Sequence, residues 1–369
     1  MDFQFRSVIN KKNTAEFADR IKTAYPEFDK SAFINDIHAS LEELSYGDRI
    51  KLVSSMIEKY IPLDYERTLK ILLSSMTDKL TTNYITGFEG FINLPIGSYV
   101  SKNGLEHFEL SMNALYELTK RFTSESDIRP FIAKYPEQSL NLLKTWANDE
   151  NMHVRRLVSE GTRPRLPLGS RLKMFVENPL PVIELLDLLK DDPELYVRRS
   201  VANSLNDIAK DNPDVVVETL ERWNNEIQSQ NMEWITKHAL RTLVKQGNPG
   251  ALNILGYKHG AELEVKNIVF DKPSVKIGES IRFDFEIHSK SNEIQPIVID
   301  YEIHYVKANG KLQAKTFKIN KKDLDGEIIS ISKKHSFKEM STRKHYPGKH
   351  LLKIKINGVI YGESEFVVT

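Results

Sequence analysis

The segments HVRRLVSEG (residues 153–161) and YVRRSVANSLND (residues 196–207) are two copies of one pattern, and their valines, Val154 and Val197, lie 43 residues apart. The same interval separates Pro136 from Pro179, and each proline begins an apolar-rich segment. A short acidic turn then leads into each arginine pair. This order predicts two consecutive units, each made of two helices joined by an acidic turn.

The helical pattern extends well beyond these two copies. From Ala15 to about Leu255, apolar residues recur every three to four positions, with Pro, Gly, Asn and Asp at the breaks. A period of 43 residues falls within the range of HEAT-like units, and a looser third copy begins at Pro213. Residues 1–258 are therefore predicted to form a HEAT-like solenoid. The segment 87–104, with Pro95, Gly97 and Gly104, is predicted to be a structured loop. The clearest predicted helices are 28–44, 47–61, 65–76, 108–122, 136–147, 179–189, 196–210, 213–223 and 234–245.

The pattern changes after Gly256. Runs such as LEVKNIVF (263–270), SIRFDFEIH (280–288) and IVIDYEIHYV (297–306) alternate apolar and polar residues, and turn residues separate them. About seven short strands over ~110 residues are typical of an immunoglobulin-like β-sandwich. We therefore predict a multidomain α-then-β protein, with the sandwich in residues 259–369.

Composition excludes several classes of protein. The chain has no cysteine, so it holds neither disulfides nor thiolate metal ligands, and its histidines are scattered, so we expect no metal site. No apolar run approaches the ~20 residues needed to cross a membrane, and no signal peptide pattern is present, so we expect a cytoplasmic protein. The net charge is +1, so any nucleic-acid surface must be a local patch.

Such a patch is predicted around the arginine pairs. Arg199, Asn203 and Asp207 lie at i, i+4 and i+8 on one helix, and the linker GTRPRLPLGSRL (161–172) adds further arginines. One interpretation is that these side chains form ordinary exposed ion pairs. The other is that they contact a DNA backbone from a concave surface. The candidates for DNA contact are Arg155, Arg156, Arg163, Arg165, Arg198, Arg199 and Asn203.

Acids among those arginines would repel phosphate, so they need another role. A carboxylate beside the sugar of a nucleotide can stabilise the positive charge that develops at C1′ when the bond to the base breaks. It can also orient the attacking water. A cationic, alkylated base is already a good leaving group, so this chemistry needs no cofactor.

The tract HVRRLVSEGTRPRLP followed by YVRRSVANSLNDIAKDNPD, with the upstream block RFTSESDIRPFIAKYPE (121–137), resembles the AlkC branch of the AlkC/AlkD bacterial DNA alkylation-repair glycosylases. The likeness covers nearly the whole chain. It implies a monomeric enzyme without cofactor that excises cationic N-alkylated bases, chiefly 3-methyladenine, from double-stranded DNA. It also implies that Glu125, Glu160 and Asp207 are the catalytic acids, with Asp207 beside the deoxyribose.

One position departs from the family pattern. The residue after RPRLP is commonly aromatic in that family, and here it is Leu168. Leucine cannot make the cation–π contact that a tryptophan would offer to a cationic base. Two alternatives therefore stay open at this point: a HEAT-repeat protein that binds DNA structures without catalysis, and a protein scaffold.

Overall fold

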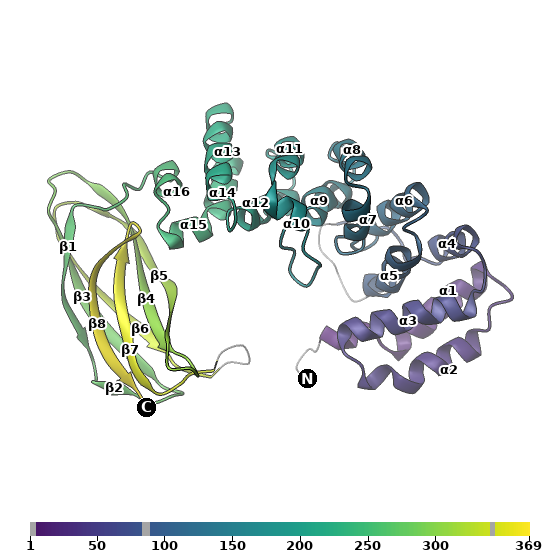
Figure 1. The fold of residues 1–369 in the computed structure, drawn as a ribbon, viewed down its shortest axis with the longest axis horizontal. Coiled ribbons are helices and arrows are strands. Elements are labelled where there is room, and N and C mark those ends of the chain that lie inside the picture. Colours follow the sequence, from purple (N-terminus) through teal and green to yellow (C-terminus); the bar gives the residue numbers. More distant parts are fainter. Residues whose placement is uncertain (1–4, 83–88, 340–343) are drawn as a thin grey trace. The chain divides into compact units, whose positions relative to one another are not determined.

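The computed structural model describes residues 5–82, 89–339 and 344–369, and Figure 1 shows them as a ribbon. Two compact units are present. The first comprises Met1–Asn212 with Gln228–His238, and the second comprises Pro213–Ile227 with Ala239–Thr369. The predicted order, a helical region followed by a β-rich region, is confirmed. Among the described residues, no helix is both long and apolar enough to cross a membrane.

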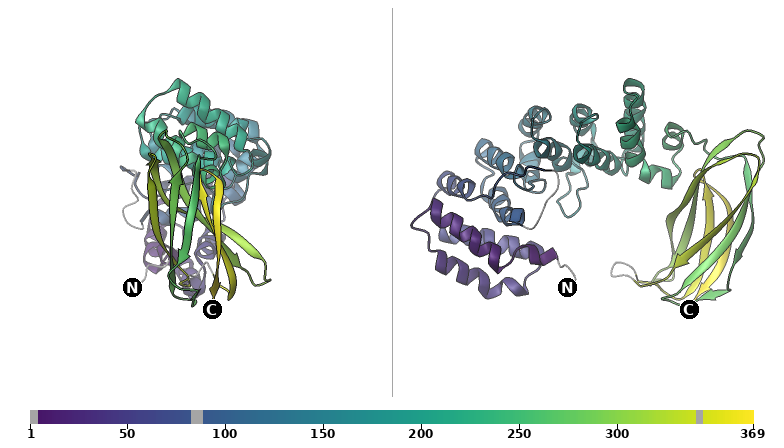
Figure 2. Two further views of the ribbon diagram at one scale, coloured as in Figure 1. Left: turned by 90° about the vertical axis from the view of Figure 1, so that its left-hand side faces the viewer. Right: turned by 180° about the vertical axis from the view of Figure 1, so that it is seen from behind.

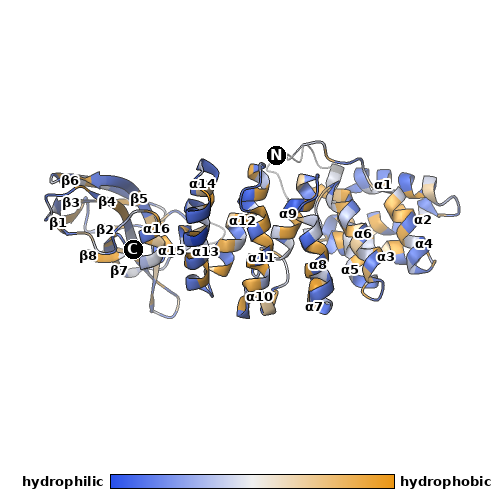
Figure 3. Ribbon diagram, turned by 90° about the horizontal axis from the view of Figure 1, so that it is seen from above, coloured by the Kyte–Doolittle hydropathy of each residue, from blue (hydrophilic) through white to orange (hydrophobic). Residues whose placement is uncertain are grey.

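The first unit is made of helices. Its central repeats lie as two layers, with α8 and α11 side by side in one and α9 and α12 side by side in the other (Figures 1 and 3). The helices are α1 (Lys11–Ala24), α2 (Lys30–Ser40), α3 (Tyr46–Tyr60), α4 (Tyr65–Ser74), α5 (Leu94–Asn103), α6 (Phe108–Thr119), α7 (Arg129–Lys134), α8 (Pro136–Trp146), α9 (Met152–Gly161), α10 (Lys173–Glu177), α11 (Leu180–Leu189), α12 (Leu195–Ile208) and most of α14 (Gln230–Ala239).

The 43-residue repeat is visible as helix pairs. α8 with α9 forms one unit, and α11 with α12 forms the next. The predicted apolar stripe of each inner helix is fully buried, for example Val154 in α9 and Val197 and Leu205 in α12. α9 and α12 approach closely because small residues face each other: the Ser159 hydroxyl donates to the Ser200 hydroxyl over 2.8 Å. This contact lies beside Glu160, at the end of α9.

The prediction of a loop over residues 87–104 is wrong for most of the segment. Leu94–Asn103 forms α5, and residues 87–88 lie outside the described part of the chain. Pro95 is compatible with the helix because it occupies the first turn, where its missing N–H is not needed. Gly97 is required by packing, since an added Cβ would lie 2.2 Å from Oδ2 of Asp127. The expected helix 234–245 is also interrupted, because α14 ends at Ala239 and α15 begins at Arg241.

The second unit contains a two-sheet β-sandwich. One sheet has the order β1-β3-β6 and the other β2-β8-β7-β4-β5, and Figure 2 shows them from two further sides. The described residues of this unit form α13 (Pro213–Glu226), α15 (Arg241–Gln246), α16 (Pro249–Ile254), β1 (Leu263–Phe270), β2 (Ser274–Val275), β3 (Ser280–Ser289), β4 (Gln295–Val306), β5 (Leu312–Leu324), β6 (Ile328–Ser336), β7 (Gly348–Ile356) and β8 (Val359–Val368).

Alternation along the strands places one side of each strand in the core. Phe283 of β3 packs against Tyr301 of the opposite sheet, with their ring centres 5.0 Å apart, and both side chains are buried, as is Phe285. Tyr301 and Tyr305 of β4 also bond to the two ring nitrogens of His335 on β6, each over 2.8 Å. The two sheets are therefore joined by polar contacts as well as by apolar packing.

The sandwich packs against the short helices that precede it. The ammonium of Lys355 on β7 donates to the carbonyl of Lys245 in α15 over 2.9 Å. The backbones of Gly247 and Gly358 touch so closely that a Cβ on Gly247 would lie 2.5 Å from Cα of Gly358. The boundary at residue 258 stays a prediction; it falls between the last helix, which ends at Ile254, and the first strand.

Candidate active site

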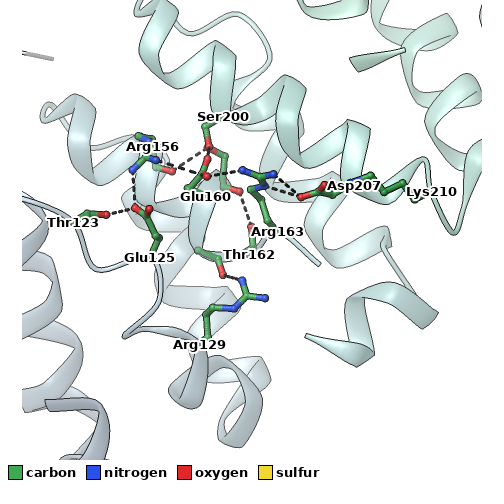
Figure 4. A network of polar contacts seen from close by, with 12 residues as sticks. Thr123, Glu125, Arg129, Arg156, Glu160, Thr162, Arg163, Ser200, Asp207 and Lys210 are labelled. Atoms are coloured by element: carbon green, nitrogen blue, oxygen red, sulfur yellow. Dashed lines mark hydrogen bonds and ion pairs between the residues drawn. The ribbon is translucent and has the colours of Figure 1, made fainter. Parts of the chain in front are cut away.

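The three acids expected to be catalytic are brought together by one chain of ion pairs (Figure 4). Arg163, which follows α9, lies at its centre. Its Nη1 donates to Oε1 of Glu160 over 2.6 Å, and its Nε and Nη2 both lie 2.8 Å from Oδ2 of Asp207. Glu160 comes from the end of α9 and Asp207 from the end of α12. A single guanidinium thus bridges two carboxylates that are 47 residues apart in the sequence.

Arg156 extends this chain to the third acid. Its Nη1 donates to Oε2 of Glu125 over 2.8 Å, and its Nη2 lies 3.7 Å from Oε1 of Glu160. Thr123 donates a hydrogen bond to the same oxygen of Glu125. Glu125 is supplied by the segment between α6 and α7, so three separate parts of the first unit build the cluster. We call the cluster of Glu125, Arg156, Glu160, Arg163 and Asp207 the acid–arginine cluster.

Burial differs among the three acids. The side chain of Asp207 is 3% exposed and that of Glu160 is 8% exposed, whereas Glu125 is 22% exposed. The remaining oxygen of Asp207, Oδ1, accepts from the ammonium of Lys210 over 2.7 Å, and Lys210 is 40% exposed. Glu125 is therefore the most accessible carboxylate, and the flexible side chain of Lys210 covers the free side of Asp207.

The electrostatics of Arg156 and Arg163 follow from these neighbours. Burial acts to lower the pKa of each guanidinium, but the adjacent carboxylates overcome this effect, and both pKa values lie above the ordinary value. The guanidinium of Arg156 also lies 4.9 Å from the ring centre of Tyr196, a cation–π contact. Burial raises the pKa of the Tyr196 hydroxyl. Both arginines are therefore held as cations within the first unit.

Most of the predicted DNA-contacting arginines have partners inside the protein. Arg155 makes a two-pronged ion pair with Asp192, with distances of 2.6 and 3.1 Å. Arg198 is buried, and its Nη1 donates to the carbonyls of Asp192 and Pro193 over 2.6 and 2.8 Å. Arg155 likewise donates to the carbonyls of Asp149 and Glu150, so in both copies the repeated arginine fixes the acidic turn ahead of its own helix. These contacts give Arg155 and Arg198 a structural role in the protein.

The other predicted DNA contacts differ in exposure. Arg165 pairs with both oxygens of Asp211 at 2.6 and 2.5 Å, in a partly exposed position. Arg199 is exposed, and Asn203 is half-buried one turn further along α12. Contact of any of these side chains with DNA phosphate stays a prediction.

Two residues of the site were not predicted from the sequence. Ser200 donates to Oε2 of Glu160 over 2.6 Å and thereby satisfies the second oxygen of that carboxylate. Arg129 is fully buried and donates to the carbonyl of Gly161 over 2.8 Å and to that of Ser170 over 2.7 Å. Burial, together with nearby Arg163, lowers the pKa of Arg129 to about 10. Neither residue stands out in the sequence, because Ser200 replaces an apolar residue of the other copy and Arg129 only precedes a proline at the start of a short helix.

The described residues offer no group of three or more His, Asp or Glu side chains arranged to hold a metal ion. The site itself offers carboxylates, guanidinium groups and hydroxyl groups. Carboxylates held in place beside a water-accessible surface can stabilise a developing cation and accept a proton.

Known proteins resemble this chain over its whole length. Residues 123–243 match the family described as "DNA alkylation repair enzyme", and residues 264–369 match that described as "Uncharacterised protein YhaZ, C-terminal Ig-like domain". The chain is 34% identical over 365 residues to the uncharacterized protein YhaZ of Bacillus subtilis (strain 168), covering 98% of this chain and 99% of that protein. It is 37% identical to the alkylpurine DNA glycosylase AlkC of Pseudomonas fluorescens, solved bound to DNA containing an abasic site analog, with a TM-score of 0.90 and full coverage of both chains.

The helical repeats, the β-sandwich and these matches define a protein of the DNA alkylation-repair class. Within that class, the chain belongs to the AlkC branch, with a HEAT-like helical region followed by an immunoglobulin-like domain. The resemblance and the fold class expected from the sequence are both confirmed.

Proposed function

We propose that this protein is a DNA glycosylase that hydrolyses the N-glycosidic bond of cationic N-alkylated bases, chiefly 3-methyladenine, in double-stranded DNA. The observation that carries the proposal is the convergence of Glu125, Glu160 and Asp207 in one cluster from three parts of the first unit. A fold shared over its whole length with an alkylpurine DNA glycosylase supports it. We further propose that it acts as a monomer in the cytoplasm.

The reaction needs little from the protein beyond negative charge and an oriented water. In alkylated adenosine, the bond between C1′ and N9 breaks, and its electron pair goes to the base, which leaves neutral. Positive charge develops on the sugar, where carboxylates stabilise it. The oxygen of water then bonds to C1′, and its proton passes to a carboxylate and on to solvent.

The geometry suggests how the acids divide this work. Asp207 is held by Arg163 on one oxygen and covered by Lys210 on the other, and it is the least exposed of the three carboxylates, so we assign it the position beside the deoxyribose. Glu160 is fixed by Arg163 and Ser200 and supplies further negative charge. Glu125, the most exposed of the three, is suited to orient the water.

Binding without catalysis is the alternative, and one assay separates the two. Duplex DNA treated with a methylating agent is incubated with the full chain, and the released bases are separated by chromatography. A glycosylase releases 3-methyladenine in proportion to enzyme and time, above the spontaneous loss seen without protein. Salt-dependent binding of the same duplex with no base release would instead identify a non-catalytic DNA binder.

A further inference from the structure

A tight turn follows Arg163 in the linker between α9 and α10. The residues at its four positions are Leu166, Pro167, Leu168 and Gly169, and the N–H of Gly169 donates to the carbonyl of Leu166 over 3.2 Å. Leu168 has a φ of +63°. Proline at the second position and a positive φ at the third are the marks of a type II β-turn. Glycine is the usual residue at that third position, so the leucine holds a strained conformation.

The side chain of Leu168 gains nothing from the folded protein. It is 100% exposed, whereas Leu166 and Leu172 on either side of it are buried. The strained backbone destabilises the free protein, and the exposed leucine side chain gains no burial that would offset this cost. Backbone strain that no contact in the folded state offsets is often found where a ligand binds.

The turn is rigidly mounted on the candidate active site. Its far end is held by Arg129, which links the carbonyl of Ser170 to that of Gly161 at the end of α9. Its near end is held by the two-pronged pair between Arg165 and Asp211, and the N–H of Leu172 donates to the carbonyl of Pro164 over 3.3 Å. The loop begins at the guanidinium that bridges two of the proposed catalytic acids. Leu168 is therefore an apolar tip on a braced loop that starts inside the acid–arginine cluster.

We propose that Leu168 inserts into the DNA base stack at the lesion. Through this residue the protein recognises the weak stacking between the damaged base and its neighbours instead of the charge of the damaged base. This inference rests on the proposed glycosylase function and deepens it. Apolar side chains of this size are used as wedges between base steps, where they open the stack by occupying space. An aliphatic wedge has no π face, so it does not favour a cationic base over a neutral one. Preference for cationic bases then arises only in the bond-breaking step, from the carboxylates.

The test uses a duplex that contains a stable tetrahydrofuran abasic site flanked by 2-aminopurine, whose fluorescence rises when it is unstacked. The full chain is expected to raise this fluorescence severalfold. The Leu168→Gly variant removes the wedge and suits the positive φ, so it is expected to fold at least as stably as the parent. It should lose most of the fluorescence rise and bind this duplex about tenfold more weakly, with undamaged duplex bound equally well. Leu188→Ala, at a half-exposed leucine of α11, is the matched control and should behave as the parent.

A second variant tests the recognition rule. Leu168→Trp restores a wedge with a π face, so it should recover the fluorescence rise and bind a duplex with a cationic N-methylated base severalfold more tightly than a duplex with a neutral base of the same shape, a preference that the parent lacks. An unchanged fluorescence rise in Leu168→Gly would overturn the wedge, and an equal preference for the cationic base in the parent would overturn the rule. Base release by the parent together with an unchanged Leu168→Gly signal refutes the wedge alone. A Leu168-dependent signal without base release refutes the glycosylase function and leaves the wedge standing.

Discussion

Replacing Arg163 by methionine should destabilise the first unit strongly, because this one guanidinium neutralises two buried carboxylates. Its side chain is 9% exposed, and those of its partners Glu160 and Asp207 are 8% and 3% exposed. Removing one partner of a buried ion pair typically costs about 3–5 kcal/mol, since the remaining charge is left without compensation. Lys210 and Arg156 offset part of this loss. We expect Arg163→Met to lower the free energy of unfolding by about 4 kcal/mol.

Urea unfolding followed by helical circular dichroism measures this loss. With a urea slope of about 2–3 kcal/mol per molar, the midpoint of the helical transition should fall by roughly 1.3–2 M. Arg165→Met is the matched control, because Arg165 lies two residues away and its pair with Asp211 is 27% and 21% exposed. It should cost less than about 1 kcal/mol.

A rescue variant separates lost charge compensation from lost packing. Combining Arg163→Met with Glu160→Gln and Asp207→Asn removes the unpaired charges, so most of the stability should return. Equal midpoints for Arg163→Met and Arg165→Met would show that Arg163 does not compensate two buried charges. So would a triple variant no more stable than Arg163→Met alone, because packing would then explain the whole loss.

Three other variants test the surroundings of the site. Burial raises the pKa of Asp127 to about 7, so the folded protein holds this proton more tightly than the unfolded chain, and the resulting stabilisation is lost as pH rises from about 4 through 7. The free energy of unfolding of Asp127→Asn, measured by calorimetry, should therefore rise by about 1–3 kcal/mol relative to that of the parent between pH 5 and pH 8. A difference between the two proteins that does not change with pH would contradict a raised pKa for Asp127. Gly97→Ala should lower the free energy of unfolding in urea by roughly 1–3 kcal/mol, because its Cβ would lie 2.2 Å from the Asp127 carboxylate. Adding Asp127→Ala to the same chain should restore most of this stability. Arg129→Met should speed amide hydrogen exchange in residues 164–172 at least tenfold while exchange in α3 stays unchanged; equal exchange in both proteins would show that Arg129 does not brace the loop.

The fold was largely predictable from periodicity. The 43-residue repeat and the alternating strands depend on which residues are apolar, and burial of Val154, Val197 and Phe283 follows from that pattern alone. The prediction of a loop at residues 87–104 is wrong because proline and glycine usually interrupt helices, whereas Pro95 and Gly97 both lie within α5. Proline is harmless in the first turn, and Gly97 is selected by a contact with Asp127, 30 residues away in the sequence. Local patterns cannot reveal such a contact.

The site was predictable in part. The resemblance to a family pointed to Glu125, Glu160 and Asp207, and the structure brings them together. The partners of the arginines were not predictable, because Asp192 and Asp211 reach Arg155 and Arg165 only through the turns between helices. Leu168 could be recognised as a departure from a motif, but its strained φ and complete exposure are properties of the folded turn.

The proposed function depends on carboxylates of the acid–arginine cluster that stabilise the sugar cation. The most direct measurement is the single-turnover rate of 3-methyladenine release from methylated duplex DNA by Asp207→Asn, with DNA affinity and thermal stability measured on the same sample. Asp207→Asn keeps the shape of the side chain, and losing transition-state stabilisation of this kind lowers rates by about 100- to 1,000-fold. We predict a loss of that size with affinity for abasic-analog duplex within about threefold of the parent. Release of 3-methyladenine by a folded, DNA-binding Asp207→Asn protein at the parental rate would contradict the account.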